Sequence, residues 1–567
     1  MSIIGTIYED VTTEVLGNIG IWQWLVVVAS TVLAVPSMFN QYEDMFLLKP
    51  SLEVICIPPE RYEVLNASLC TVTSINNAAA QLKCGKWHVK LFWLIWLKKS
   101  WLVFCDNKMK LLSTTMISRM GLMFGCVMFG LIADSCGRRI AIAINLFVDL
   151  CMGLIMTFCD SQPWFQLLVF LKSLFGAATL YMGLVITCEI ASNRWRSRLN
   201  AIASVPQLLS MTCMLPLANA FPNLETYNFM ATLLSVLLII ILRWIPESPQ
   251  WLLYNRKIIK AEKIIYEAAK RNGTSLCEDF KIRPVNHRAY HCLDEIRTCS
   301  GIFTRHNVRV LILVSLLLWS LTSFQLSYIY ANVFKEDKSN QYLFALMSSV
   351  VGLVSLTILL SRKILMRHLL ILNIIISGIS ASAEVTLGHI TIFHAPKIFS
   401  IFALASGIVV YLLLLNITPR LFAINIRATL FGCCHAIGQL GSMFSYLLFV
   451  FQPFSNEVSI VKDVVVTAVL ISLSLILLDV DGREMPDVID DMDYFLELSK
   501  PLRWATQKTN SPSHEEVEMR IYSFGSGGRQ VSHPHSLDRL PAQRIGFGKF
   551  RRSLFANIRR IFSRNSD

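Results

Sequence analysis

Long stretches without charged side chains recur along this chain of 567 residues. Many of them reach the roughly 18–20 residues that a helix needs to cross a bilayer. Hydrophobic residues make up 54% of the chain and charged residues 16%, against roughly 45–50% and about 25% in soluble domains. This much apolar surface must face something other than water. We therefore predict an all-α polytopic membrane protein, which excludes soluble enzymes, disordered chains and small disulfide-stabilised domains.

The apolar pattern predicts twelve membrane-spanning helices, at residues 19–38, 111–133, 140–158, 164–188, 201–220, 229–244, 310–330, 342–361, 369–387, 398–416, 428–451 and 464–478. Two long loops, residues 39–110 and 246–307, separate some of these spans, and a tail follows at residues 480–567. An even number of spans places residues 1–18 and the tail on the same side of the membrane.

The positive charges of the short loops predict which side this is. Lys and Arg gather around residues 138–139, 194–198 and 362–367, whereas the connections at 222–226 and 388–397 carry almost none. Short loops rich in Lys and Arg stay in the cytoplasm, and long loops cross largely regardless of charge. Both termini and the long central loop are therefore expected in the cytoplasm, and the long first loop outside. The net charge of +13 then reflects cytoplasmic loops, and binding to nucleic acid is not expected.

The outside loop contains four cysteines, an even number in an oxidising compartment, which favours two disulfides of undetermined pairing. They are Cys56, Cys70, Cys84 and Cys105. Asn66, followed by Ala and Ser, begins an N-glycosylation pattern in the same loop. Asn272 begins the same pattern inside the cell, where we expect it to stay unmodified.

After the second span, residues 130–139 read Gly-Leu-Ile-Ala-Asp-Ser-Cys-Gly-Arg-Arg. Glycines allow helices to approach closely, and Asp134 is suited to meet the positive end of a neighbouring helix or an arginine. The arginine pair alone would indicate only a cytoplasmic loop. The full pattern resembles the signature loop of the major facilitator superfamily.

Three further stretches narrow this resemblance to solute carrier family 22, the organic cation, anion and carnitine transporters. They are Cys-Asp-Asn at 105–107, Pro-Glu-Ser-Pro-Gln-Trp-Leu-Leu at 246–253 and Met-Pro-Asp-Val-Ile-Asp-Asp at 485–491. The resemblance covers about residues 19–493. It implies two six-helix bundles, residues 19–245 and 308–479, which expose a central site to each side in turn.

The resemblance also implies a set of gating residues at the cytoplasmic face. They are Asp134, Arg138, Arg139, Glu189, Arg196 and Glu247 in the first half and Arg427 in the second. Charge-assisted pairs among them would hold this face shut while the site is open outward. The alternative is a set of solvated charges that contribute little.

The second half departs from the family pattern. The loop after the eighth span reads Ser-Arg-Lys-Ile-Leu at 361–365 and lacks the expected Asp and Gly. Before the eleventh span, Arg420 stands where the family carries Glu, although Arg427 is retained. The sequence therefore predicts that the second-half latch is absent.

Polar side chains at bilayer depth are costly and mark candidate solute contacts. The candidates are Gln439, His435, Asp149 and Lys172, with the aromatic residues Tyr181, Trp319 and Phe324. By the resemblance, Gln439 falls where cation-transporting relatives carry Asp and anion-transporting relatives carry Arg. A neutral amide removes the simplest argument for selection by charge, so a zwitterionic or uncharged polar solute fits as well as either ion. The alternatives are a helix-to-helix hydrogen bond for Gln439, simple packing for His435, and an ion pair between Asp149 and Lys172.

These features favour a plasma-membrane transporter, not an enzyme, which moves a small organic cation or a carnitine-like zwitterion by alternating access, without cofactor or metal. An organic anion exchanger and a binding or scaffold protein without transport are the alternatives. The tail is expected to be mostly disordered. Its residues 549–563 have the pattern of a basic amphipathic helix for anionic inner-leaflet lipids, or of a plain solvated tail.

Overall fold

The computed structural model describes residues 19–35, 108–159, 162–220, 224–273, 305–333, 338–361, 365–387, 395–451 and 456–477. It also describes short segments between 54 and 89, residues 283–284 and 522–523, and single positions between 480 and 492. The proposed tail helix at 549–563 and the N-terminal residues 1–18 lie outside this part of the chain.

Helices occupy all twelve predicted spans, which confirms the fold class. The first half contains α2 (Ile21–Leu33), α4 (Lys108–Cys136), α5 (Arg138–Thr157), α6 (Gln162–Gly176), α7 (Thr179–Ile190), α8 (Asn193–Ala203), α9 (Val205–Ala220) and α10 (Leu224–Ile241) with η1 (Leu242–Trp244). The second half contains α15 (His306–Val333), α16 (Lys338–Ser361), α17 (Met366–Leu387), α18 (Ala395–Ile417) with η2 (Thr418–Arg420), α19 (Arg427–Phe451) and α20 (Asn456–Ile476). Within the described residues, eight helical spans are long and apolar enough to cross a membrane.

The fifth and twelfth spans begin eight residues earlier than hydropathy predicts, the largest differences among the spans, because their charges are satisfied inside the protein. The fifth begins with α8, whose Arg196 is fully buried. The twelfth begins at Asn456, because Lys462 forms an ion pair with Asp463 at 3.0 Å and lies 3.2 Å from the ring centroid of Tyr328. The fourth span is also divided, into α6 and α7.

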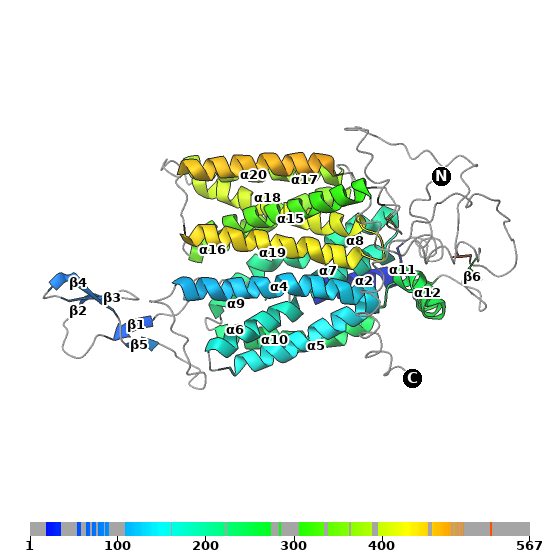
Figure 1. Ribbon diagram of the computed structural model, residues 1–567, viewed down its shortest axis with the longest axis horizontal. Helices are drawn as coiled ribbons and strands as arrows, with labels where there is room; N and C mark the ends of the chain where they lie inside the picture. The colour runs from blue at the N-terminus through cyan, green and yellow to red at the C-terminus, as the bar shows by residue number, and fades with distance from the viewer. Residues whose placement is uncertain are drawn as a thin grey trace.

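The helices run side by side, with the first half below and the second half above in Figure 1, and α4 lies along α19 between them. Large apolar side chains point outward around this bundle, including Phe147 (62% exposed), Ile240 (66%), Ile379 (63%) and Val465 (54%). So extensive an apolar surface is suited to lipid and not to water.

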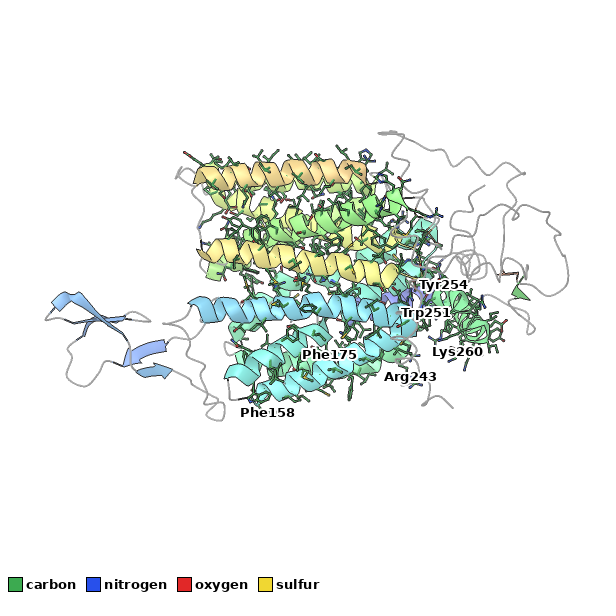
Figure 2. The ribbon with its side chains drawn as sticks, in the orientation of Figure 1. Phe158, Phe175, Arg243, Trp251, Tyr254 and Lys260 are labelled. Atoms are coloured by element: carbon green, nitrogen blue, oxygen red, sulfur yellow. The ribbon has the colours of Figure 1, made fainter. Side chains whose placement is uncertain are left out.

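Two short helices of the central loop, α11 (Pro249–Tyr254) and α12 (Ile258–Asn272), lie at one end of the bundle (Figure 1). Ser248 caps α11 by accepting a hydrogen bond from the backbone N–H of Trp251 at 3.3 Å, and Pro249 suits the first helical position. Trp251 and Tyr254 lie at this end, and Phe158, which follows α5, lies at the opposite end (Figure 2). Helix α5 therefore spans the bundle.

The first span begins at the same end as the central loop. The side chain of Asn272 accepts a hydrogen bond from the backbone N–H of Trp22 and donates one to Gln23, each at 2.9 Å. These bonds fix the start of α2 to the end of α12. That Asn272 is not glycosylated stays a prediction.

The loop between α2 and α4 contains strands at the opposite end of the bundle (Figure 1). Strands β1 (Val54–Ile57) and β5 (Lys86–Val89) pair antiparallel, and β2 (Val64–Ala67), β3 (Thr71–Ser74) and β4 (Asn77–Lys83) form a second antiparallel sheet. No strands were predicted in this loop from the sequence. A two-residue pairing also joins β6 (Arg283–Pro284) to β7 (Tyr522–Ser523).

The two disulfides and the glycosylation of Asn66 that the sequence predicts belong to this loop, and both stay predictions. Cys56 lies on β1 and Asn66 on β2. Cys70, Cys84 and Cys105 lie outside the described residues.

Candidate functional site

Helices α4 and α19 approach each other closely at two glycines. A Cβ atom added at Gly130 would lie 2.7 Å from the carbonyl oxygen of Ala428, and one at Gly432 would overlap the carbonyl oxygen of Cys126. Only glycine permits this backbone approach between the two halves. The close contact positions the side chains described next.

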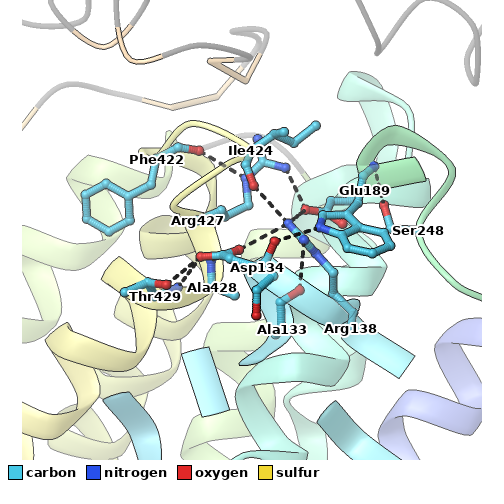
Figure 3. A network of polar contacts seen from close by, with 12 residues as sticks. Ala133, Asp134, Arg138, Glu189, Ser248, Phe422, Ile424, Arg427, Ala428 and Thr429 are labelled. Carbon is cyan, nitrogen blue, oxygen red and sulfur yellow. Dashed lines mark hydrogen bonds and ion pairs between the residues drawn. The ribbon is translucent and has the colours of Figure 1, made fainter. Parts of the chain in front are cut away.

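Asp134, at the end of α4, binds the beginning of α19 (Figure 3). Its carboxylate accepts hydrogen bonds from the backbone N–H groups of Ala428 at 3.3 Å and Thr429 at 2.8 Å, and from the Thr429 hydroxyl at 2.6 Å. The N–H groups at a helix N-terminus favour a negative charge. This contact therefore joins the first half to the second.

Arg138, Glu189 and Arg427 form a buried chain of ion pairs beside it (Figure 3). The carboxylate of Glu189 lies 3.0 Å from the guanidinium of Arg138 and 2.9 Å from that of Arg427, and all three side chains are 0% exposed. Asp134 lies 3.5 Å from Arg138. Two acids thus balance two arginines, which is the condition for burying charges.

Glu247 fixes the first turn of α5. Its carboxylate accepts hydrogen bonds from the backbone N–H groups of Arg138 at 2.8 Å, Arg139 at 3.3 Å and Ser248 at 3.2 Å. Burial raises the pKa of the Glu247 carboxyl above its ordinary value, although Arg138 and the backbone N–H groups oppose this shift. The positive φ of Gly137, 124°, lets the chain turn tightly from α4 into α5 beside this carboxylate.

The structure thus brings Asp134, Arg138, Glu189, Glu247 and Arg427 into one network. The remaining two gating candidates lie differently. The guanidinium of Arg196 donates to the carbonyl oxygens of Cys188 at 3.1 Å and Ala191 at 3.0 Å, at the end of α7, and the side chain of Arg139 is exposed.

The second half holds a contact that the sequence did not predict. Arg420, at the position of the reversed charge, is 1% exposed and bonds to Ser197 of α8 and to Asp481. Asp481 was not predicted from the sequence, because it lies after the last span and outside the motif in which the resembled family carries its acid. Arg420 and Ser197 therefore connect the two halves at this position.

His435 and Gln439 lie on α19, and each contacts a side chain of α4 in the first half. The ring of His435 lies 2.9 Å from the hydroxyl of Tyr411 and 3.2 Å from the sulfur of Cys126, so it contacts both halves. Tyr181 stacks on it with ring centroids 6.2 Å apart, and the centroid of Trp319 lies 5.5 Å away. Tyr411 was missed because it stands in an otherwise apolar run.

Gln439 accepts a hydrogen bond from the guanidinium of Arg119 at 2.9 Å. Arg119 lies on α4, is 7% exposed, and has its guanidinium carbon 5.8 Å from the ring centroid of Tyr446. The sequence analysis overlooked this residue, although an arginine inside an apolar span was a sufficient signal. A positive side chain therefore reaches from the first half to the position where the resembled families differ in charge.

The other candidates lie apart from this group. Lys172 donates to the side chain of Asn228 at 2.6 Å, and Asn228 donates to the carbonyl oxygen of Gly153 at 2.9 Å. These contacts join α6, α10 and α5 within the first half, and Asp149 is buried on the same α5. Phe324 lies against Phe444, with ring centroids 6.0 Å apart.

A family model described as "Sugar (and other) transporter" matches residues 70–479. The chain belongs to this family. This is a family of membrane transporters and not of enzymes.

Curated relatives agree with the predicted resemblance to solute carrier family 22. The chain is 27% identical over 160 residues to solute carrier family 22 member 2 of Rattus norvegicus, over 28% of this chain and 29% of the relative. It is 27% identical over 197 residues to member 3 of Rattus norvegicus, over 34% and 36%, and 27% identical over 180 residues to member 13 of Homo sapiens, over 32% and 33%. The chain thus matches only about a third of these relatives' length.

Solved structures show the same fold. The proton:xylose symporter XylE bound to 6-bromo-6-deoxy-D-glucose is 13% identical with a TM-score of 0.58, covering 86% of this chain and 100% of that one. A partially occluded inward-open conformation of the xylose transporter XylE from E. coli is 12% identical with a TM-score of 0.52, covering 82% and 99%. At these identities the likeness concerns the fold alone.

Proposed function

We propose that the protein moves a small organic solute across the plasma membrane by alternating access, with both termini and the α11–α12 end in the cytoplasm. The observation that carries this proposal is the buried, charge-balanced network in which Asp134 and Glu189 of the first half hold α19 and Arg427 of the second. A site between the halves can open to the cytoplasm only when these contacts separate. The network is therefore the gate of the transport cycle.

The solute carries a carboxylate, and a carnitine-like zwitterion fits best. Arg119 presents a guanidinium between the halves, and its planar donors match a carboxylate in a bidentate manner. The ring faces of Tyr181, Trp319 and Tyr411, which surround His435, suit the quaternary ammonium group of a zwitterion. A solute with only a positive charge would meet Arg119 unfavourably.

Uptake of a matched pair of solutes tests this proposal. Cells that express the full chain at their surface receive carnitine, which is zwitterionic, or its methyl ester, which is a cation of nearly the same shape. We expect uptake of carnitine and little uptake of the ester. Arg119→Gln should lower carnitine uptake by about tenfold or more, as expected for the loss of a charge-assisted hydrogen bond, and should affect the ester less. Arg243→Gln, an exposed arginine, is the matched control.

Each result has a separate meaning. Better uptake of the ester than of carnitine would contradict the proposal that the transported solute carries a carboxylate. No flux of any cationic, anionic or zwitterionic solute, with surface expression confirmed, would favour the binding or scaffold alternative.

A further inference from the structure

Arg420 is one of the largest fully buried side chains of the described region, and it lies where the resembled pattern carries an acid. A buried guanidinium requires hydrogen-bond acceptors and a compensating charge. Its Nη1 atom lies 2.9 Å from the hydroxyl oxygen of Ser197 and 3.4 Å from the carboxylate of Asp481, and its Nη2 atom donates to the carbonyl oxygen of Val480. The reversed charge is therefore compensated by the segment that follows α20.

The carboxylate of Asp481 contacts Ser197, Arg420 and Met366. One carboxylate oxygen accepts a hydrogen bond from the Ser197 hydroxyl at 2.8 Å and lies beside Arg420. The other accepts a hydrogen bond from the backbone N–H of Met366 at 2.8 Å, at the first residue of α17. An acid is thus present at the start of α17, although the loop before that helix contains none.

Ser197 is the only one of these residues that belongs to the first half. It lies on α8, is 3% exposed, and its backbone carbonyl oxygen also accepts a hydrogen bond from the side chain of Asn416 at 2.9 Å. Its hydroxyl can donate to Asp481 while it accepts from Arg420, so a single side chain uses both of its hydrogen-bonding roles across the boundary.

We infer that Ser197, Arg420 and Asp481 form a second gate contact, in which the segment after the last span supplies the acid that the second-half motifs have lost. The arrangement parallels the first contact, where Asp134 binds the N-terminus of α19 and also joins the two halves. It rests on the alternating-access function proposed above. Arg420 and Asp481 are then positioning residues, because they act on the first half through Ser197.

Hydrogen–deuterium exchange of the purified full-length protein in lipid nanodiscs tests the inference without any solute. Ser197→Ala, Arg420→Gln and Asp481→Asn should each speed exchange in α8 about tenfold, the change expected when one charge-assisted hydrogen bond is lost. If the contact belongs to a gate, exchange should also rise at the start of α19, to which Ser197 forms no hydrogen bond within the described part of the chain. Thr429→Val, which removes one hydroxyl bond to Asp134, is the matched variant of the first contact, and Arg243→Gln is the control.

Two results would overturn the inference. One is faster exchange confined to α8 in all three variants, which is the signature of a local structural role. The other is a double variant, Ser197→Ala with Asp481→Asn, in which the two effects multiply, because residues of one contact should not act independently. Ser197→Ala removes only a hydroxyl, so it keeps the test valid if a charge variant fails to fold. Uptake is measured in a separate experiment. If exchange rises in both α8 and the start of α19 but no solute is taken up, the proposed transport is rejected, whereas the inferred contact between the halves is not.

Discussion

Glu189 forms ion pairs with two buried arginines. Neutralising it should therefore lower the melting temperature more than neutralising an exposed charge. In Glu189→Gln the shape of the side chain is kept, but Arg427 loses the carboxylate at 2.9 Å and Arg138 loses the one at 3.0 Å, although Asp134 still lies 3.5 Å from Arg138. The two lost ion pairs, at 2.9 and 3.0 Å, each represent roughly 5–6 kcal/mol of gross attraction at an effective dielectric constant of about 20. The net loss on breaking a buried pair is about 3–5 kcal/mol.

A unit of 150–250 residues, which is the size of one half, loses roughly 2–4 °C of melting temperature per kcal/mol. Glu189→Gln should therefore melt about 10 °C lower than the parent in a thermal scan monitored by size-exclusion fluorescence. Glu267→Gln, an exposed acid on α12, is the control and should leave the melting temperature unchanged.

The double variant Glu189→Gln with Arg427→Gln decides whether charge balance is the cause. It removes one acid and one base, so the net charge of the network is the same as in the parent, and Arg138 keeps Asp134 at 3.5 Å. We expect it to recover at least half of the lost melting temperature. If the double variant melts lower than either single variant, the network is held by shape and hydrogen bonds, and the reasoning from charge is refuted.

Three further predictions concern separate features. Gly432→Ala should lower the melting temperature by an amount that corresponds to about 1–3 kcal/mol, because its Cβ meets the carbonyl oxygen of Cys126; an unchanged melting temperature would contradict the close approach. The pKa of Glu247 is raised above 4.5 in the folded protein, so just above that pH the folded state binds more protons than the unfolded chain and stability falls as pH rises; Glu247→Gln should remove this slope from a stability–pH curve. Asn66→Gln should abolish the gel shift on deglycosylation, whereas Asn272→Gln should not alter it.

The sequence predicted the fold well because hydropathy reports directly on the lipid environment. It failed where buried charges are paired. The start of α20 was misplaced because Lys462 and Asp463 together look like a loop, although their ion pair allows both to lie inside the bundle. The start of α8 was misplaced for the same reason, since the bonds of Arg196 to backbone carbonyl groups are visible only in three dimensions.

The gate residues were predictable where a motif keeps them in a fixed order along the chain. Asp134 and Glu189 were found in this way, and the structure places both in one network. Asp481 could not be predicted from the sequence, because its role depends on a contact with Arg420, 61 residues away. No local pattern encodes that contact. Arg119 was missed although its charge stands out in an apolar span, because its contact with Gln439 joins residues 320 positions apart and no local pattern encodes it.

The two gate contacts differ in what crosses the boundary between the halves, and this predicts an order of opening. At the first contact an ion pair joins the two halves, because Glu189 binds Arg427. Asp134 also binds the start of α19. At the second contact the residue of the first half is Ser197, whose hydroxyl and backbone carbonyl group are uncharged. Separating a buried ion pair costs about 3–5 kcal/mol, and losing a hydrogen bond between a neutral and a charged group costs about 1.5–3 kcal/mol. We therefore expect α8 to exchange hydrogen faster than the start of α19 in the parent protein, and equal or reversed rates would show that the two contacts open together or in the opposite order.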